Sequence, residues 1–472
     1  MEALPACCGG RLRVATLHFS FLQPRGYAVL EAVRHPGRIV PVLFSVFLTV
    51  GTILLCLPIS RTNSDEAPNV LAAAFTAVSA SCVTGLAVVD TATYWSTFGQ
   101  FVIMLLIQVG GFGIMTMATL LAILAGGRLG LSTRLVAQSE SHASSMGNVK
   151  AILRTIGTTV VITEGVVALV LAARFYFGYG YSVGSALWQG VFHSISAFNN
   201  AGFALYSDGL MGFNQDIWII GPICASIVAG GLGFPVFYEL YRRWRVPDKW
   251  TVHAKVTILG YFSLLFVGCV GFAAFEWNND GTIGSMSLWG KFINSLIGGI
   301  TPRTAGFNAI DYGKASHETW ALDDALMFIG GGSAGTAGGI KVGTFILLAF
   351  VIWNEIRGEA DVVVGNRSVP RELLRQAVTV VLLAIGVVAI GTMALLILTD
   401  YSLDVIAFEA ISAFGTVGLS TGITPALPGA AQLVLMFLMY VGRIGTVTTA
   451  TALALNTRHR HFRLPEERPI IG

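Results

Sequence analysis

Eight long apolar stretches constrain this chain more than any other feature of its sequence. Each approaches or exceeds the roughly 20 residues that a helix needs to cross the hydrocarbon of a bilayer. They occupy Val40–Leu57, Phe98–Ala125, Ile152–Phe177, Ile217–Leu240, Thr257–Phe275, Ala325–Trp353, Ala377–Leu398 and Leu433–Leu455. Because lipid cannot satisfy an open backbone, such segments must be helices. They predict an all-α polytopic membrane protein with eight transmembrane helices.

Composition agrees with this class and excludes others. The chain has 472 residues, of which 54% are hydrophobic and only 12% are charged, whereas soluble domains carry about 25% charged residues. The net charge of +3 is too small to indicate a nucleic-acid partner. The six cysteines have no paired spacing beyond Cys7-Cys8, so neither a disulfide framework nor a zinc site is expected. The first forty residues lack the pattern of a signal peptide and are interpreted as a retained amphipathic arm.

Basic residues indicate the orientation of the spans. Five segments hold 22 of the 29 Lys and Arg residues: 1–39, 126–154, 241–256, 354–375 and 456–472. Cytoplasmic loops of membrane proteins carry such an excess. Both termini are therefore predicted to be cytoplasmic, and the protein is expected in the cell (plasma) membrane. The basic segment 242–255 has a second interpretation, as a docking site for a cytosolic partner.

The four external loops share a motif. Each contains a short apolar stretch that ends in a glycine followed by a bulky apolar residue. The glycines are Gly85, Gly202, Gly306 and Gly418, at intervals of 117, 104 and 112 residues. In three stretches a Phe stands ten residues before the glycine and a Ser-Ala pair six and five before it. The repeating unit is span, half-helix, glycine turn, span, and four parallel units are expected to surround a central pore.

This organisation divides the chain into six parts. They are a cytoplasmic N-terminal arm (1–38), repeat 1 (39–126), repeat 2 (127–245), repeat 3 (246–356), repeat 4 (357–456) and a cytoplasmic tail (457–472).

The glycine turns are the predicted ion site. Half-helices that enter from outside would aim the negative ends of their dipoles at the centre of the bilayer. Glycine permits backbone angles that turn neighbouring carbonyls inward, so four such segments would form an oxygen cage that replaces the hydration shell of an ion. The predicted filter residues are Val83, Thr84, Gly85, Asn200, Ala201, Gly202, Thr304, Ala305, Gly306, Thr416, Val417 and Gly418. No ring of carboxylates precedes the glycines, which favours a monovalent cation. A single such loop would more often be a tight turn or a helix contact, but four matched loops favour the filter.

A gate is predicted below this site. Arg443 stands where two other repeats have Gly111 and Gly231, and an arginine in lipid normally faces a cavity or a partner. Six glycines in ten residues would cost a helix about 6 kcal/mol relative to alanine, which indicates a broken helix. The predicted gate residues are Gly330, Gly331, Gly332, Ser333, Ala334, Gly335, Thr336, Ala337, Gly338, Gly339, Lys341 and Arg443. The alternatives are a snorkelling or packing arginine and a glycine-rich helix contact. Lys341 is expected to pair with a nearby carbonyl or acid.

Three other polar residues carry open interpretations. Glu164 is either the partner of a buried cation or a water-facing or protonated acid. His193 is expected to make a structural hydrogen bond. Arg303 is either a charge in the pore vestibule or the partner of a nearby acid that braces the third filter loop.

The motifs Val-Thr-Gly-Leu at 83–86, Asn-Asn-Ala-Gly-Phe at 199–203 and Thr-Pro-Arg-Thr-Ala-Gly-Phe at 301–307 resemble the Trk/Ktr/HKT superfamily of potassium transporters. The resemblance covers residues 36–460, and eight spans without an extra pair are similar to the bacterial KtrB type of membrane subunit. It implies potassium uptake, one glycine per filter repeat, an intramembrane gate at 330–339, a homodimer and a KtrA-like cytosolic ring of nucleotide-binding regulatory subunits. It implies no covalent cofactor, and potassium as the ion, with sodium as a second ion left open. The apolar Val417 departs from a polar filter, but only backbone oxygens are needed there.

Two other classes of function have less support in the sequence. An alternating-access transporter for a cation-coupled solute often has inverted repeats, whereas these repeats are parallel. A membrane enzyme is not expected, because the sequence lacks a Ser/His/Asp-like cluster, an H-E-x-x-H pair and a Walker A loop. The sequence therefore favours an ion-conducting subunit that is not an enzyme.

Overall fold

The computed structural model describes residues 36–63, 67–113, 149–359, 361–364 and 367–455. The predicted N-terminal arm and Cys7-Cys8, the C-terminal tail 457–472 and the segment 114–148 lie largely or wholly outside the described residues. Within them, almost all regular structure is helical. One two-stranded hairpin, β1 (Val363–Val364) paired with β2 (Arg367–Ser368), was not predicted.

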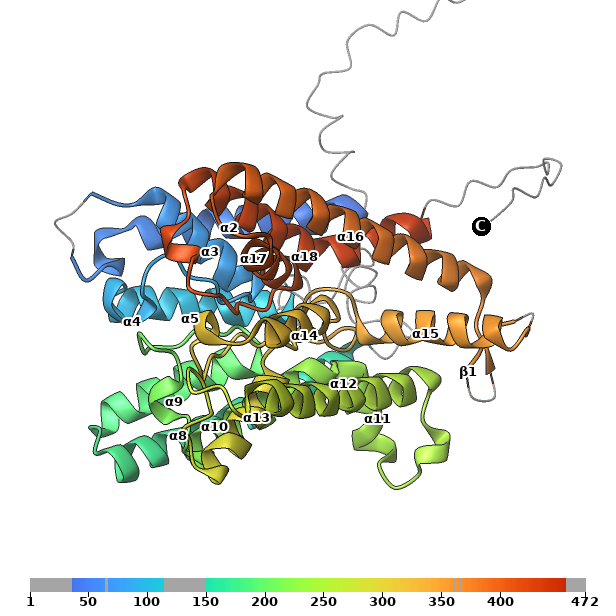
Figure 1. Cartoon of the computed structure of the whole chain (residues 1–472), viewed down its shortest axis with the longest axis horizontal. Coiled ribbons are helices and arrows are strands. Elements are labelled where there is room, and N and C mark those ends of the chain that lie inside the picture. The colour runs from blue at the N-terminus through green and yellow to red at the C-terminus, as the bar shows by residue number, and fades with distance from the viewer. Residues whose placement is uncertain (1–35, 64–66, 114–148, 360, 365–366, 456–472) are drawn as a thin grey trace, which may run out of the picture.

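The helices form four groups in chain order (Figure 1). The first group contains α2 (Pro36–Cys56), α3 (Val70–Cys82), the short α4 (Thr91–Tyr94) and α5 (Thr97–Phe112), and the second contains α8 (Val149–Tyr179), α9 (Val183–Phe198), α10 (Ile217–Leu232) and α11 (Phe234–Arg243). The third group contains α12 (Val252–Glu276), α13 (Leu288–Ile300), α14 (His317–Phe328) and α15 (Val342–Ile356). The fourth group contains α16 (Arg371–Leu398), α17 (Leu403–Gly415) and α18 (Gly429–Leu455). Single 3-10 turns lie at Pro58–Ser60, Met211–Phe213, Pro247–Lys249, Tyr312–Lys314 and Thr424–Ala426.

One short helix in each group is buried by the longer ones. α3 packs between α2 and α5, α9 between α8 and α10, and α17 between α16 and α18, while α13 packs on α12. Asn69, Ser182 and Ser287 accept hydrogen bonds at the N-termini of α3, α9 and α13, so their starts are fixed by side-chain caps. These are the helices expected as half-helices before the glycine turns.

The groups are joined in a ring. α5 packs on α9, α10 on α13, α14 on α17 and α18 on α3. The helix after each glycine turn thus contacts the short helix of the next group, and the last group contacts the first. The four glycine turns are consequently held around one axis.

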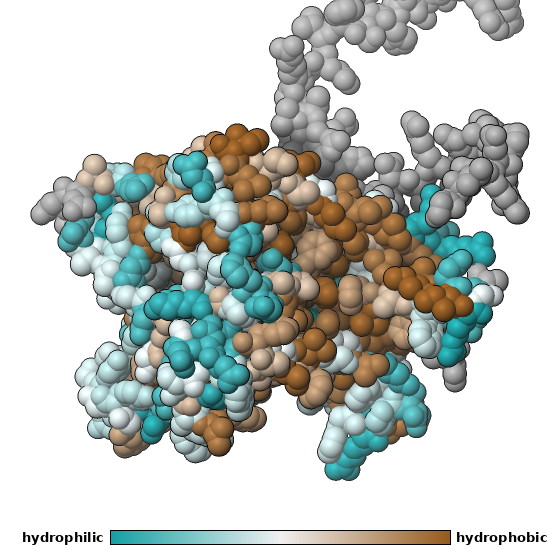
Figure 2. Space-filling model, in the orientation of Figure 1, coloured by the Kyte–Doolittle hydropathy of each residue, from teal (hydrophilic) through white to brown (hydrophobic). Residues whose placement is uncertain are grey.

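Among the described residues, three helical segments are long and apolar enough to cross a membrane, at 156–179, 252–276 and 371–398. A fourth is counted if α10 and α11 form one bent span, and the other apolar helices are 10–17 residues long. On the visible face, hydrophobic residues cover the middle and hydrophilic residues gather toward the two ends (Figure 2).

One predicted span differs in the structure. Ile217–Leu240 was expected to be one span, but a 96° bend separates α10 from α11 at Gly233, whose φ of +92° suits glycine. Helix α5 covers the predicted span Phe98–Ala125 as far as Phe112, and residues 114–125 lie outside the described residues. In the stretch Ala325–Trp353, α14 ends at Phe328 and α15 begins at Val342, so the helix is interrupted over the glycine-rich segment. α15 extends from the centre of the molecule toward its edge, beside the hairpin (Figure 1).

Candidate functional site

The four glycine turns meet face to face. A Cβ added to any of these glycines would collide with a backbone carbonyl oxygen of the following turn. The distances would be 2.5 Å from Gly85 to Ala201 O, 2.8 Å from Gly202 to Ala305 O, 2.1 Å from Gly306 to Val417 O and 1.9 Å from Gly418 to Thr84 O. The contacts run in chain order and close from the fourth turn to the first. We call this arrangement, residues 83–85, 200–202, 304–306 and 416–418, the glycine ring.

The backbone of the ring is unusual at two positions in every turn. All four glycines have positive φ, between +69° and +96°. The residue two positions earlier also has positive φ, although none is glycine: Val83, Asn200, Thr304 and Thr416. Such angles cost side-chain-bearing residues roughly 1–3 kcal/mol each and persist only where the surroundings impose them. The repeated pattern shows that all four turns adopt a related, over-determined conformation.

The chemistry offered by the ring is that of backbone oxygens. The residues whose carbonyls face the neighbouring glycines, Thr84, Ala201, Ala305 and Val417, are fully buried. Across the part of the chain that the structure describes, no cluster of three or more His, Cys, Asp or Glu side chains could hold a metal ion. A cage of neutral carbonyl dipoles at helix C-termini suits a weakly hydrated monovalent cation.

The glycine-rich segment lies against two of the turns. The hydroxyl of Thr336 donates to Phe198 O at the end of α9 (3.2 Å), and the Gly332 amide donates to Gly231 O of α10 (2.7 Å). Gly338 lies beside Thr416, where an added Cβ would be 1.9 Å from the threonine hydroxyl. Only glycine fits at that position. Segment 329–341 therefore fills the space next to the second and fourth turns of the ring.

Arg443 joins this segment to α5. Its Nη2 donates to Gly110 O (2.5 Å) and Gly111 O (3.3 Å), and its Nη1 donates to Thr336 O. The acceptors include carbonyls in the last turn of α5, where the helix dipole favours a cation. Lys341 donates to Ala337 O at 2.5 Å, within its own segment.

Both interpretations of Arg303 are wrong. Its side chain is completely buried, so it is not a charge in a vestibule. Among the described residues it forms no ion pair; Nη2 donates to Gly330 O at 2.6 Å, and the guanidinium lies 5.2 Å from the centre of the Tyr261 ring. Arg303 therefore connects the third turn to the start of the glycine-rich segment.

The other two polar residues, Glu164 and His193, form hydrogen bonds near the second turn. Both oxygens of Glu164 accept from Gln108 Nε2, and Oε1 also accepts from Asn199 Nδ2 at 3.2 Å. Within the part of the chain that the structure describes, the partners of its carboxylate are therefore amides and not a buried cation. His193 Nδ1 bonds with Gln189 O at 2.8 Å, and its Nε2 accepts from the Leu205 amide at 3.3 Å. The predicted structural hydrogen bond of His193 is confirmed.

Sequence reasoning missed the serine hydroxyls behind the ring and the strained residues before each glycine. The serines were part of the predicted Ser-Ala motif, but their hydroxyls were not predicted to form hydrogen bonds. A positive φ at Val83 or Thr416 cannot be predicted from the sequence, because β-branched residues are expected to avoid this backbone angle.

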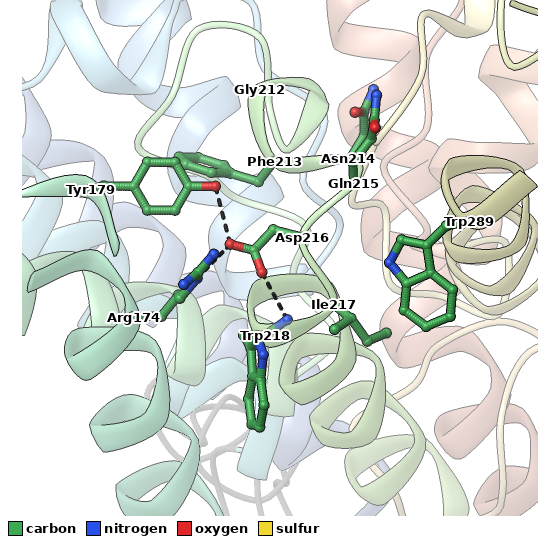
Figure 3. Close-up of a pocket in the computed structure, with 10 residues that line it drawn as sticks. All are labelled: Arg174, Tyr179, Gly212, Phe213, Asn214, Gln215, Asp216, Ile217, Trp218 and Trp289. Atoms are coloured by element: carbon green, nitrogen blue, oxygen red, sulfur yellow. Dashed lines mark hydrogen bonds and ion pairs between the residues drawn. The ribbon is translucent and has the colours of Figure 1, made fainter. Parts of the chain in front are cut away.

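A separate pocket of about 530 Å³ shares no residue with the glycine ring (Figure 3). It lies between α8, the start of α10 and Trp289 of α13. Asp216 accepts from Arg174 Nε (2.7 Å), the Tyr179 hydroxyl (3.1 Å) and the Trp218 amide (3.0 Å). The charged groups of the pocket thus satisfy one another, and the glycine ring remains the better candidate site.

Comparison with known proteins places the chain among transport proteins. Residues 31–460 match the profile of the TrkH family, described as cation transport protein. The chain is 36% identical to Ktr system potassium uptake protein B of Bacillus subtilis (strain 168), over 94% of this chain and 98% of the relative. It is 33% identical to potassium/sodium uptake protein NtpJ of Enterococcus hirae, over 93% of this chain and 97% of the relative.

A solved structure is similar in fold. The potassium transporter TrkH from Vibrio parahaemolyticus superposes with a TM-score of 0.67, covering 90% of this chain and 85% of that one, at 18% sequence identity.

Proposed function

Because the chain belongs to the TrkH family of cation transport proteins, we propose that it takes up potassium across the cell membrane as the translocating subunit of a Ktr-type system. Its relatives are transport proteins and not enzymes. The potassium ion is the substrate, and it passes through the glycine ring.

The observation that carries this proposal is the cyclic contact between each ring glycine and the carbonyl of the next turn. Four neutral carbonyl groups on one axis can replace water around an ion without the strong field of carboxylates. That chemistry favours a monovalent cation that sheds its water easily. The parallel order of the turns gives no support to the alternating-access alternative, which relies on inverted repeats.

We assign the gate to segment 330–339 together with Lys341 and Arg443. The segment packs beside the second and fourth turns, and Arg443 ties it to the end of α5. A fixed positive charge next to the path raises the electrostatic barrier to a cation. Movement of the segment would have to break the Arg443 hydrogen bonds, which gives a regulator a defined contact to act on.

The membrane arrangement completes the proposal. Eight spans in four parallel repeats, both termini in the cytoplasm, a homodimer and a KtrA-like cytosolic ring are inferred from the sequence pattern and the family. Short helices are compatible with eight spans, because α10 bends into α11, α14 is followed by α15, and residues 114–125 of the predicted span Phe98–Ala125 lie outside the described residues. The relative described as potassium/sodium uptake protein supports sodium as a second ion that the test must include.

Complementation tests the proposed function. Cells that lack their own potassium uptake would receive the full chain, with and without a Ktr-type cytosolic subunit, and potassium and sodium uptake would be measured. We expect growth at low external potassium and saturable uptake that depends on the full chain. A chain that reaches the membrane but carries no potassium in either arrangement would refute the proposal.

A further inference from the structure

Two serine hydroxyls accept hydrogen bonds from the first and fourth turns of the glycine ring. The Gly85 amide donates to Ser79 Oγ, and the Gly418 amide donates to Ser412 Oγ, both at 3.1 Å. Both serines are completely buried, and each lies six residues before its glycine. The backbone oxygens of the same serines accept from the preceding amides, Thr84 N at 2.8 Å and Val417 N at 2.9 Å. Each serine thus binds two consecutive amides of its turn.

These bonds fix the direction of a ring carbonyl. In a trans peptide the C=O and N–H groups lie in one plane and point in opposite directions. When the Gly85 amide points back to Ser79, the carbonyl of Thr84 must point away from α3. Thr84 O is the oxygen that faces Gly418, and Val417 O, fixed by Ser412 in the same way, is the oxygen that faces Gly306.

The second and third turns use their hydroxyls differently. Ser196 Oγ donates to Phe203 O at 2.8 Å, and Thr301 Oγ1 donates to Phe307 O at 2.7 Å. In both cases the acceptor is the residue after the glycine, and the hydroxyl does not bind the glycine amide. The ring therefore consists of two pairs, turns 1 and 4 with one mode and turns 2 and 3 with the other. The glycine φ values follow the same pairs, +96° and +95° against +69° and +69°.

We propose that Ser79 and Ser412 are positioning residues that set ion selectivity, by holding the Thr84 and Val417 carbonyls toward the axis. This inference rests on the proposed function and deepens it. The serines do not touch the ion; they act through the peptide planes of the ring. Loss of either hydroxyl leaves a buried glycine amide without its acceptor and lets the attached carbonyl turn, so that a smaller or more strongly hydrated cation is no longer excluded.

The test compares side chains of equal shape. Thr and Val differ in a hydroxyl and a methyl, so Ser412→Thr and Ser412→Val impose the same crowding, but only the first keeps an acceptor; Ser79→Thr and Ser79→Val form a second pair. Ser81→Ala is the matched control, because the Ser81 hydroxyl is buried in the same helix as Ser79 and has no hydrogen-bond partner among the described residues. The full chain is expressed with its cytosolic subunit, and potassium and sodium uptake are normalised to the amount of protein in the membrane.

We expect the ratio of potassium to sodium uptake to fall about three- to tenfold in each Val variant, the range that one lost buried hydrogen bond implies. The Thr variants and Ser81→Ala should retain the wild-type ratio. Equal ratios in the Val and Thr variants, with a potassium-selective wild type, would overturn this inference and leave the proposed function intact. A wild-type chain that carries no potassium would overturn both.

Discussion

Arg443 of α18 and Gly110 of α5 are 333 positions apart in the chain, and the guanidinium Nη2 donates to the glycine carbonyl at 2.5 Å. The same side chain binds the carbonyl of Thr336 in the glycine-rich segment. One cation therefore connects the fourth helix group, the first group and the proposed gate. Because all the acceptors described above are backbone carbonyls, the contact depends on where the backbone lies, and movement of the segment would break it.

Replacement of this cation should loosen the gate. Arg443→Gln removes the charge and most of the donors, and charge-assisted hydrogen bonds of this kind contribute about 1.5–3 kcal/mol. We expect potassium flux in the absence of the proposed regulatory subunit to rise roughly tenfold or more. The measurement is tracer flux in vesicles that contain the purified full chain. Arg443→Lys keeps the charge and should lie between wild type and Arg443→Gln; tightly regulated flux in Arg443→Gln would contradict the assignment.

Side chains at the ring glycines should impair selectivity. Gly202→Ser places a Cβ 2.8 Å from Ala305 O at a φ of +69°, so both the contact and the backbone angle are unfavourable. The ring must widen or turn, and we expect the preference for potassium over sodium to fall by about tenfold. Gly85→Ser should behave in the same way. Uptake of both ions by cells that depend on the chain gives the ratio.

Gly184→Ser is the control for these variants. Gly184 lies in α9, in the same helix group as Gly202, but it has no heavy atom within 4 Å of an added Cβ and no positive φ. It should keep the wild-type ratio at normal abundance. The filter assignment is wrong if Gly202→Ser and Gly184→Ser have the same selectivity.

The sequence predicted the parts of this site that depend on residue type. Glycine is needed where backbones approach closely, so the four turns and the broken helix at 330–339 could be located from their glycines. The basic residues and the apolar stretches gave the order of the elements. The comparison with the solved fold agrees with a mostly helical chain of this family.

The contacts that connect these parts could not be predicted. Arg303 binds the carbonyl of Gly330 and packs on Tyr261, although its sequence neighbours suggested a vestibule or an acid. A backbone carbonyl is present at every residue, so it leaves no trace in the sequence when it serves as an acceptor. The strained angles at Val83 and Thr416 are likewise imposed by the surrounding helices and not by the residues themselves.

Shortening the glycine-rich segment should raise basal flux. Removal of residues 335–337 deletes Thr336, whose backbone and hydroxyl hold the segment to Arg443 and Phe198. The shortened segment lacks both hydrogen bonds, and we expect unregulated potassium flux to increase severalfold. Gly343→Ala is the control, since this glycine follows the segment in α15 and has nothing within 4 Å of an added Cβ. Flux that stays tightly regulated in the deletion would show that the segment is not the gate.

The last prediction concerns stability at the end of α12. Glu276 is fully buried and accepts five hydrogen bonds. Its Oε1 accepts from the Ser316 amide and hydroxyl (both 2.8 Å) and from the Thr319 hydroxyl (2.5 Å). Its Oε2 accepts from Asn279 Nδ2 (2.7 Å) and from the Thr282 hydroxyl (2.5 Å). It therefore ties α12 to the start of α14. Glu276→Gln keeps the shape but replaces one acceptor oxygen with a donor that faces other donors, which should cost about 1–3 kcal/mol. Thermal unfolding of the purified full chain should move down by several degrees, whereas the exposed Glu318→Gln should leave it unchanged. Equal unfolding temperatures for the two variants would show that the hydrogen bonds of Glu276 add little to the stability of the folded chain.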